Sequence, residues 1–234
     1  MKQASLNTVA VIPAAGSGIR MKSERAKQFL SLDGRPVLAV TLRFFQDCSE
    51  VDGVVLVVPP GDVAFCREHI VEKFGLTKIE KIVPGGKRRQ DSVRLGIEAT
   101  EGKYDLVLIH DGVRPVIEKG LLKRVIEAAM THRAVIAALP AKETVKEVDD
   151  RREVVRTYER DRVWMVQTPQ AFRYQDVAKA HEMAVAQGWD EATDDALLVE
   201  RLGIPITVVE GSERNIKVTT PYDLELARFL LRSI

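Results

Sequence analysis

The chain has 234 residues, of which 45% are hydrophobic and 29% are charged, so it is long enough to bury a sizeable core. Its 35 Lys and Arg nearly balance 34 Asp and Glu, and a formal charge of +1 excludes a global field that attracts nucleic acid or an anionic membrane. No apolar run approaches the ~20 residues of a membrane helix, and the N-terminus lacks a signal-peptide pattern. We expect a cytoplasmic protein with neither a nucleic-acid nor a membrane partner.

Apolar, β-branched runs alternate along the first part of the chain with amphipathic stretches. The runs predict strands at 8–13, 53–59, 79–86, 104–112 and 134–140. The amphipathic stretches predict helices at 36–47, 62–74, 88–100 and 118–132. This alternation is typical of an α/β protein, and we expect a Rossmann-like, mostly parallel sheet with helices on both faces. Ligands of such sheets bind beyond the carboxyl ends of the strands.

The pattern changes at residues 141–163, which are highly charged and carry alternating valines on both sides of Asp149 and Asp150. This predicts a projecting β-hairpin arm inserted into a single domain of residues 1–234. Because an isolated hairpin is marginally stable in water, we expect the arm to pack on a second subunit and form a homodimer. A mobile surface loop is the alternative.

The remainder of the chain returns to alternating elements. Helices are expected at 174–187 and 193–203 and a strand at 205–211, and a last helix begins at Thr220-Pro221, where Thr is an N-cap followed by Pro at the first helical position. Cys48 and Cys66 have neither metal-site nor disulfide spacing, which favours buried free thiols.

A cluster of small residues follows the first predicted strand, where a parallel sheet binds its ligands. Small residues let backbone N–H groups approach a phosphate. Arg20 and Lys27 follow and could neutralise a polyphosphate from two sides, although a solvated basic loop is the alternative. The stretch is neither a P-loop nor a full dinucleotide-binding fingerprint. The proposed phosphate-binding residues are Ala14, Ala15, Gly16, Ser17 and Gly18.

Seven segments, in order, resemble one enzyme family over essentially the whole chain. They are PAAGSGIRM with KQF after it, GGKRRQDSV (85–93), HDGVRP (110–115), ETVK (143–146), TPQAF (168–172), TDDA (193–196) and NIKVTTPYDL (215–224). The first is similar to the signature of sugar-nucleotide and alditol cytidylyl- and uridylyltransferases. Together they resemble the 2-C-methyl-D-erythritol 4-phosphate cytidylyltransferases of the non-mevalonate isoprenoid pathway.

The resemblance implies Mg²⁺-dependent transfer of a cytidylyl group from CTP to 2-C-methyl-D-erythritol 4-phosphate, giving 4-diphosphocytidyl-2-C-methyl-D-erythritol and pyrophosphate. An acceptor phosphate monoester is already largely ionised at neutral pH, so the reaction needs no protein base. It needs cations that stabilise the growing negative charge on the α-phosphate. We assign this role to Arg20 and Lys27.

A carboxylate and a neighbouring cation follow the strand expected at 104–112. Asp111 ends the apolar run and is a candidate Mg²⁺ ligand, with a turn or N-cap role as the alternative. Arg114 lies three residues later and could bind the acceptor phosphate or simply pair with Asp111.

The resemblance implies further contacts with both substrates. Arg160 and Lys217 would position the acceptor phosphate, with Thr144 and Thr168 assisting, and Arg160 could enter the site of a neighbouring subunit or pair at the surface with Glu159 or Asp161. Cytidine recognition is expected around Gly86, Lys87 and Ser92. For Arg89 and Arg94 we favour a solvated helix face.

Two other functions fit parts of the pattern. A ribitol-5-phosphate cytidylyltransferase has the same loop and reaction with another polyol phosphate, but ETVK and NIKVTTP favour the methylerythritol substrate. A non-catalytic nucleotide-sensing module would not need Arg20, Lys27, Asp111 and Lys217 together along the path of the leaving group.

Overall fold

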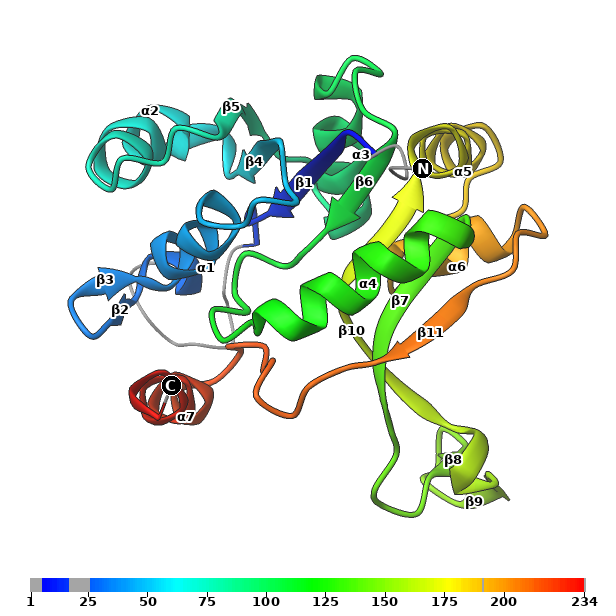
Figure 1. Cartoon of the computed structure of the whole chain (residues 1–234). Coiled ribbons are helices and arrows are strands. Elements are labelled where there is room, and N and C mark those ends of the chain that lie inside the picture. The colour runs from blue at the N-terminus through cyan, green and yellow to red at the C-terminus, as the bar shows by residue number, and fades with distance from the viewer. Residues whose placement is uncertain (1–5, 17–25, 191, 234) are drawn as a thin grey trace.

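The computed structural model describes residues 6–16, 26–190 and 192–233, and a seven-stranded sheet lies at its centre (Figure 1). All strands run parallel except β10, which is antiparallel to both of its neighbours. The predicted α/β fold with a mostly parallel sheet is therefore confirmed. The strand order is β11 (Thr207–Glu210), β7 (Ala134–Pro140), β10 (Trp164–Arg173), β6 (Leu106–Ile109), β1 (Thr8–Pro13), β4 (Gly53–Val58) and β5 (Ile79–Pro84).

Helices cover both faces of the sheet because its central strands are apolar on both sides. Successive strand side chains point to opposite faces, so Ala10 and Ile12 join one hydrophobic cluster and Val9 and Val11 join the other. The first cluster is completed by α1 (Val37–Gln46), α2 (Val63–Cys66) and α4 (Lys119–Thr131). The second is completed by α3 (Arg89–Ala99), α5 (Tyr174–Ala186) and α6 (Asp195–Glu200).

The strand β10 is absent from the sequence-based prediction. Its first half, beginning at Trp164, is exposed, and Pro169 lies in its middle, where a proline argues against a strand because it cannot donate to the ladder. In the structure the pairing with β7 shifts register between Val166 and Gln170, so Pro169 falls in the irregular stretch. The proline is therefore tolerated inside a central strand.

The predicted helix at 62–74 is helical but not continuous. A 3-10 turn (Pro60–Asp62) leads into α2, and a π-helical segment (Arg67–Glu72) follows. Cys66 is fully buried, and burial raises the pKa of its thiol to about 12, so the predicted buried thiol is confirmed there. Cys48 is only partly buried.

The predicted hairpin is present. The strands β8 (Lys146–Val148) and β9 (Val154–Thr157) form their own antiparallel sheet, which projects away from the central one (Figure 1). In its turn, the Asp149 carboxylate accepts hydrogen bonds of 2.9 Å from the N–H groups of Arg151 and Glu153. Both faces of the hairpin are exposed, including 63% of Val155.

The C-terminal helix α7 (Pro221–Arg232) starts where the sequence predicts. The Thr220 hydroxyl accepts the N–H of Asp223 at 3.2 Å, and the Asp223 carboxylate accepts the N–H of Thr220 at 2.8 Å. The helix packs through a small apolar cluster near the short β2 (Ser31–Leu32) and β3 (Arg35–Pro36). Short 3-10 turns lie at Lys27–Phe29 and Arg160–Arg162.

None of the helices in the described ranges combines the length and the apolar character that a membrane crossing needs.

Helix α3 approaches the sheet closely at Gly96, and this contact can be tested. A Cβ atom at Gly96 would lie 2.5 Å from Val11 Cγ1 and 2.9 Å from Val57 Cγ2. We expect Gly96→Ala to lower the free energy of unfolding by about 1–3 kcal/mol, although Ala is the better helix former. Urea denaturation measures the change. Gly61→Ala, where nothing lies within 4 Å, is the control, and equal stabilities of the two variants would contradict the close contact.

Candidate active site

A cavity of about 320 Å³ lies beyond the carboxyl ends of β1, β5 and β6. Parallel strands present their carboxyl ends at one edge of a sheet, so the loops that follow them meet there. The cavity is lined by Pro13, Ala14, Ala15, Gly16, Lys27, Gln28, Gly86, Lys87, Arg88, Arg89, Ser92, Asp111, Val113 and Lys217.

The lining of this cavity is strongly cationic. Among the described residues it contains five Lys or Arg side chains and one carboxylate, that of Asp111, although the whole chain carries a formal charge of only +1. Cations gathered in a concave site concentrate anions locally. A phosphorylated ligand therefore matches the cavity.

The glycine turn after β5 brings two loops into contact. A Cβ atom at Gly85 would lie 2.3 Å from the Ala15 Cβ and 2.8 Å from the Ser92 Oγ, so only glycine fits without a shift. The Ser92 hydroxyl accepts the N–H of Gly86 at 3.1 Å and donates to the Arg88 carbonyl at 3.1 Å. Ser92 therefore holds the turn against the start of α3.

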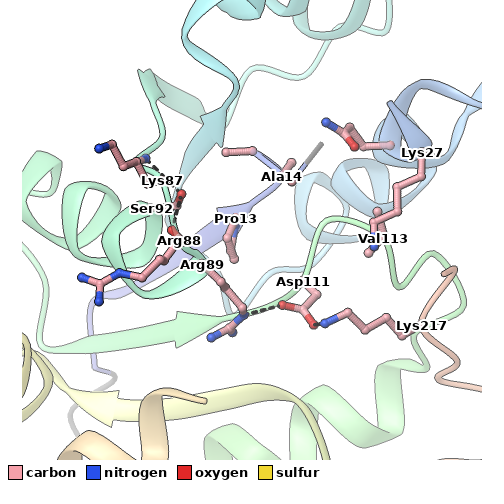
Figure 2. Close-up of a pocket in the computed structure, with 14 residues that line it drawn as sticks. Pro13, Ala14, Lys27, Lys87, Arg88, Arg89, Ser92, Asp111, Val113 and Lys217 are labelled. Carbon is pink, nitrogen blue, oxygen red and sulfur yellow. Dashed lines mark hydrogen bonds and ion pairs between the residues drawn. The ribbon is translucent and has the colours of Figure 1, made fainter. Parts of the chain in front are cut away.

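Asp111 lies at the floor of the cavity between two cations (Figure 2). Its Oδ1 is 2.9 Å from Arg89 Nε and its Oδ2 is 2.7 Å from Lys217 Nζ, while Arg114 Nε is 3.7 Å from Oδ2. Burial acts to raise the pKa of the Asp111 carboxyl, but the charges of Arg89, Lys217 and Arg114 outweigh it and hold the pKa well below its usual range. Asp111 is therefore a buried carboxylate that stays ionised.

The prediction that Arg89 lies on a solvated helix face is wrong. Arg89 points inward from the first turn of α3, and its Nη1 is 2.8 Å from an oxygen of Asp195. Its two acidic partners lie 22 and 106 residues away in the sequence, so no local pattern reveals them. Arg94 is also only partly exposed, but it turns away from the cavity, and its Nη1 pairs with the exposed Glu98 one helical turn later at 2.5 Å.

A second group of buried polar side chains holds the loop of Asp111 in place. The Thr168 hydroxyl accepts the Asp111 N–H at 3.1 Å and lies 3.1 Å from His110 Nδ1. The Asn215 amide donates to the Thr168 carbonyl at 2.6 Å, and Arg114 donates to the Asn215 carbonyl at 2.6 Å. Burial lowers the pKa of His110 to about 4, so this imidazole is neutral at pH 7.

A second cavity of about 370 Å³ adjoins the first, because Arg89, Asp111 and Lys217 line both. It also contains Arg114 and Thr168. The two cavities thus meet at the Asp111 ion-pair cluster, which we define as Asp111 with Arg89, Lys217 and Arg114.

The structure brings most of the predicted site residues together. Those that line the first cavity are Ala14, Ala15, Gly16, Lys27, Gly86, Lys87, Ser92, Asp111 and Lys217, and those that line the second are Arg114 and Thr168 with Asp111 and Lys217. Thr144 and Arg160 instead line a separate cavity on the arm. Ser17, Gly18 and Arg20 lie outside the described residues.

Sequence reasoning missed two charged residues that complete the site. The sequence predicts Arg89 at the surface and indicates no role for Asp195 beyond its membership of the TDDA motif. Arg89 lies in GGKRRQDSV and Asp195 in TDDA, and neither motif by itself indicates the ion pair between them.

The described residues contain no group of three or more His, Cys, Asp or Glu side chains that would hold a metal ion by themselves. Mg²⁺ in nucleotide sites is commonly held by one or two carboxylates together with phosphate oxygens. Asp111 is an ionised carboxylate that faces a cation-lined cavity, and each carboxylate oxygen keeps a second lone pair beside its present partner. The residues present therefore fit a magnesium ion carried in with a nucleotide.

A mostly parallel α/β sheet with a cation-lined cavity at its carboxyl edge defines a nucleotide-binding α/β protein. Residues 8–233 match the family model described as 2-C-methyl-D-erythritol 4-phosphate cytidylyltransferase. The chain belongs to this family, and the resemblance seen in the sequence motifs is confirmed.

Curated relatives carry the same description. A 2-C-methyl-D-erythritol 4-phosphate cytidylyltransferase of Geotalea uraniireducens is 46% identical and covers 98% of each chain. One of Syntrophus aciditrophicus is 49% identical over 96% of this chain and 95% of its own.

Solved structures agree. The 4-diphosphocytidyl-2C-methyl-D-erythritol synthase of Anaerococcus prevotii superimposes with a TM-score of 0.85 at 34% identity, covering 98% of each chain. The 2-C-methyl-D-erythritol 4-phosphate cytidylyltransferase of Thermus thermophilus has a TM-score of 0.78 at 37% identity, covering 95% of this chain and 98% of that one.

The Thr168 hydroxyl supports the loop of Asp111, which predicts a stability effect. Thr168→Val keeps the shape of the side chain but leaves the buried Asp111 N–H without its acceptor. We expect the free energy of unfolding to fall by about 1–3 kcal/mol, measured by urea denaturation. Thr168→Ser retains the hydroxyl and serves as the matched control. A valine variant as stable as the serine variant would contradict the supporting role.

Proposed function

We propose that this chain catalyses Mg²⁺-dependent transfer of the cytidylyl group of CTP to 2-C-methyl-D-erythritol 4-phosphate, producing 4-diphosphocytidyl-2-C-methyl-D-erythritol and pyrophosphate. Family membership supports the reaction class. The observation that carries the proposal for this chain is the meeting of two cavities at the Asp111 ion-pair cluster. One cavity accepts the nucleotide and the other the polyol phosphate, so that the α-phosphate and its attacking oxygen meet between them.

The first cavity suits the nucleotide. The small residues Ala14, Ala15 and Gly16 leave room for phosphate oxygens near the backbone, and Lys27 supplies a mobile positive charge at the same cavity. Arg20, which follows Gly16 in the sequence, shares the proposed task of stabilising charge on the α-phosphate, and Ser17 and Gly18 are proposed to bind phosphate. Gly86, Lys87 and Ser92, which line the same cavity, are the proposed cytidine contacts.

The second cavity suits the acceptor. Arg114 and Lys217 offer positive charge to its phosphate, and Thr168 lies in the same wall. The acceptor phosphate is a dianion for the larger part at pH 7, so its oxygen attacks without losing a proton to the protein. The protein orients the two phosphates and neutralises negative charge in the transition state.

Asp111 is the proposed magnesium ligand. The carboxylate is ionised and faces the cavity, so it is the group that would hold the ion beside the triphosphate. Bound Mg²⁺ supplies charge neutralisation to the phosphate oxygens. Around it, Arg89 and Lys217 keep the carboxylate in a fixed orientation.

The proposal includes a second subunit that contacts the arm. We treat residues 1–234 as one domain whose arm, residues 141–163, mediates a homodimer. Val148, Val154 and Val155 are exposed on the arm, and a partner that covers them would bury apolar surface. Thr144 and Arg160 lie together on this arm and do not line the cavities around Asp111, which favours a contribution to the partner's acceptor site. The cytoplasmic location stays a prediction from the sequence.

A pyrophosphate-release assay tests the function directly. With CTP and Mg²⁺ we expect release that depends on 2-C-methyl-D-erythritol 4-phosphate and is much slower with ribitol 5-phosphate. Replacing CTP by UTP serves as the nucleotide control. A preference for ribitol 5-phosphate would change the substrate assignment, and no release with either acceptor would favour the nucleotide-sensing module.

Subunit mixing tests the arm. Lys27→Ala and Arg160→Ala chains are each expected to be nearly inactive, because one lacks charge at the nucleotide and the other lacks it at the acceptor phosphate. If Arg160 acts across the interface, one of the two sites of a mixed dimer is intact. Half of the dimers are mixed when equal amounts of the two chains associate at random, so mixing restores up to roughly one quarter of wild-type activity. Recovery is measured after mass spectrometry has verified subunit exchange, and its absence would place Arg160 outside the partner's site.

A further inference from the structure

A chain of polar and charged side chains leads from the Asp111 ion-pair cluster to His181 on α5, and its Asp195–His181 end is buried. Arg89 Nη1 is 2.8 Å from Asp195 Oδ2, and His181 Nε2 is 3.2 Å from Asp195 Oδ1. Asp195 lies in the first turn of α6 and is 1% exposed, and His181 on α5 is 2% exposed. The Asp195–His181 end lines neither of the two cavities.

Stability alone gives little reason for this arrangement. Withdrawing a carboxylate from water is costly, and apolar side chains of similar volume often stabilise a core as well as a buried ion pair does. The neighbouring Asp194 already caps α6, since its carboxylate accepts the N–H of Leu197 at 3.0 Å. The helix therefore does not need a second acidic side chain in its first turn, and Asp195 points inward to Arg89 instead.

The geometry of Arg89 shows what Asp195 does. A guanidinium is a rigid planar fork, so fixing one of its nitrogens sets the direction of the others. With Nη1 on Asp195, Nε is directed at Asp111 Oδ1 at 2.9 Å. Figure 2 shows Arg89 reaching Asp111 from the side opposite to Lys217. The Asp111 carboxylate is thus held from two sides, and one of these depends on Asp195.

We propose that Arg89 and Asp195 are positioning residues for the transfer reaction: Asp195 orients Arg89, and Arg89 orients the Asp111 carboxylate at the junction of the two cavities. This inference rests on the proposed function. Asp195 does not line the nucleotide cavity, whose lining includes Ala14, Gly86 and Ser92. Loss of Asp195 removes no side chain from the lining of the nucleotide cavity, so it should spare CTP binding measured without Mg²⁺ and impair turnover.

The test compares Asp195→Asn, Arg89→Gln and the double variant with the wild type. We expect D195N to lower kcat roughly 10- to 100-fold, as misplacement of a supporting group commonly does, while the calorimetric Kd for CTP without Mg²⁺ changes less than about 3-fold. In the R89Q background, D195N should lower kcat by less than about 3-fold more, because Asp195 acts through Arg89. Arg94→Gln removes an ion pair on the same helix that does not reach the site, and it should retain wild-type kcat.

A readout without turnover tests the orientation itself. In ¹⁵N–¹H spectra of arginine Nε–H groups, the Arg89 signal is identified by its loss in R89Q. We expect it to shift in D195N and to stay unchanged in R94Q. Should D195N fail to fold, Arg89→Lys keeps the positive charge but cannot span both carboxylates, and we expect it to lower kcat with CTP affinity preserved.

Each contrary result has a definite meaning. An unshifted Arg89 signal with normal kcat in D195N, additive losses in the double variant, or wild-type kcat in R89K would overturn the positioning role. A parallel loss of CTP affinity in the absence of Mg²⁺ would also overturn it, since it would place the pair in nucleotide binding. Absence of turnover in the wild type contradicts the proposed function instead, and the Arg89 signal still decides whether Asp195 orients Arg89.

Discussion

The site depends on one interaction, the burial of an ionised carboxylate among cations at the edge of a sheet. Moving a charge out of water costs several kcal/mol, so Asp111 stays ionised there only because Arg89 and Lys217 lie within hydrogen-bond distance of it. These three residues follow or begin elements far apart in the chain: β6, α3 and the segment after β11. The cluster therefore forms only when the whole sheet has assembled, which links the integrity of the site to that of the fold.

The distribution of charge in this protein attracts anions at the first cavity and not over the whole surface. Among the described residues, the lining of the first cavity has five cations and one carboxylate, while acidic residues elsewhere bring the formal charge of the chain to +1. Exposed charges more than about 10 Å apart are largely screened at physiological salt, so distant acids do not cancel the field inside the cavity. A small phosphorylated molecule is therefore attracted at short range.

The sequence predicts most of the strands and helices and many of the residues that line the site, but not β10 or the ion pairs of Arg89. Strands such as 53–59 are signalled by continuous apolar runs, and the positions of Asp111 and Ser92 follow from the parallel sheet and the motifs. The strand β10 could not be predicted, because Pro169 and its exposed first half contradict the local signal, and its place is set by pairing with β6 and β7. The inward orientation of Arg89 was also beyond reach, since its partners come from remote segments.

The strand β10 serves the arm and the site at once, because it runs from exposed Trp164 at the base of the arm to Thr168 beside Asp111. This continuity limits how the chain can vary in length. Additional residues in the hairpin turn near Asp149 would extend the arm and leave the pairing of β10 intact. One residue added between Trp164 and Thr168 would turn every following side chain to the opposite face of the sheet and remove the hydroxyl from Asp111. Natural length variation should therefore accumulate at the tip of the arm and be excluded from its base.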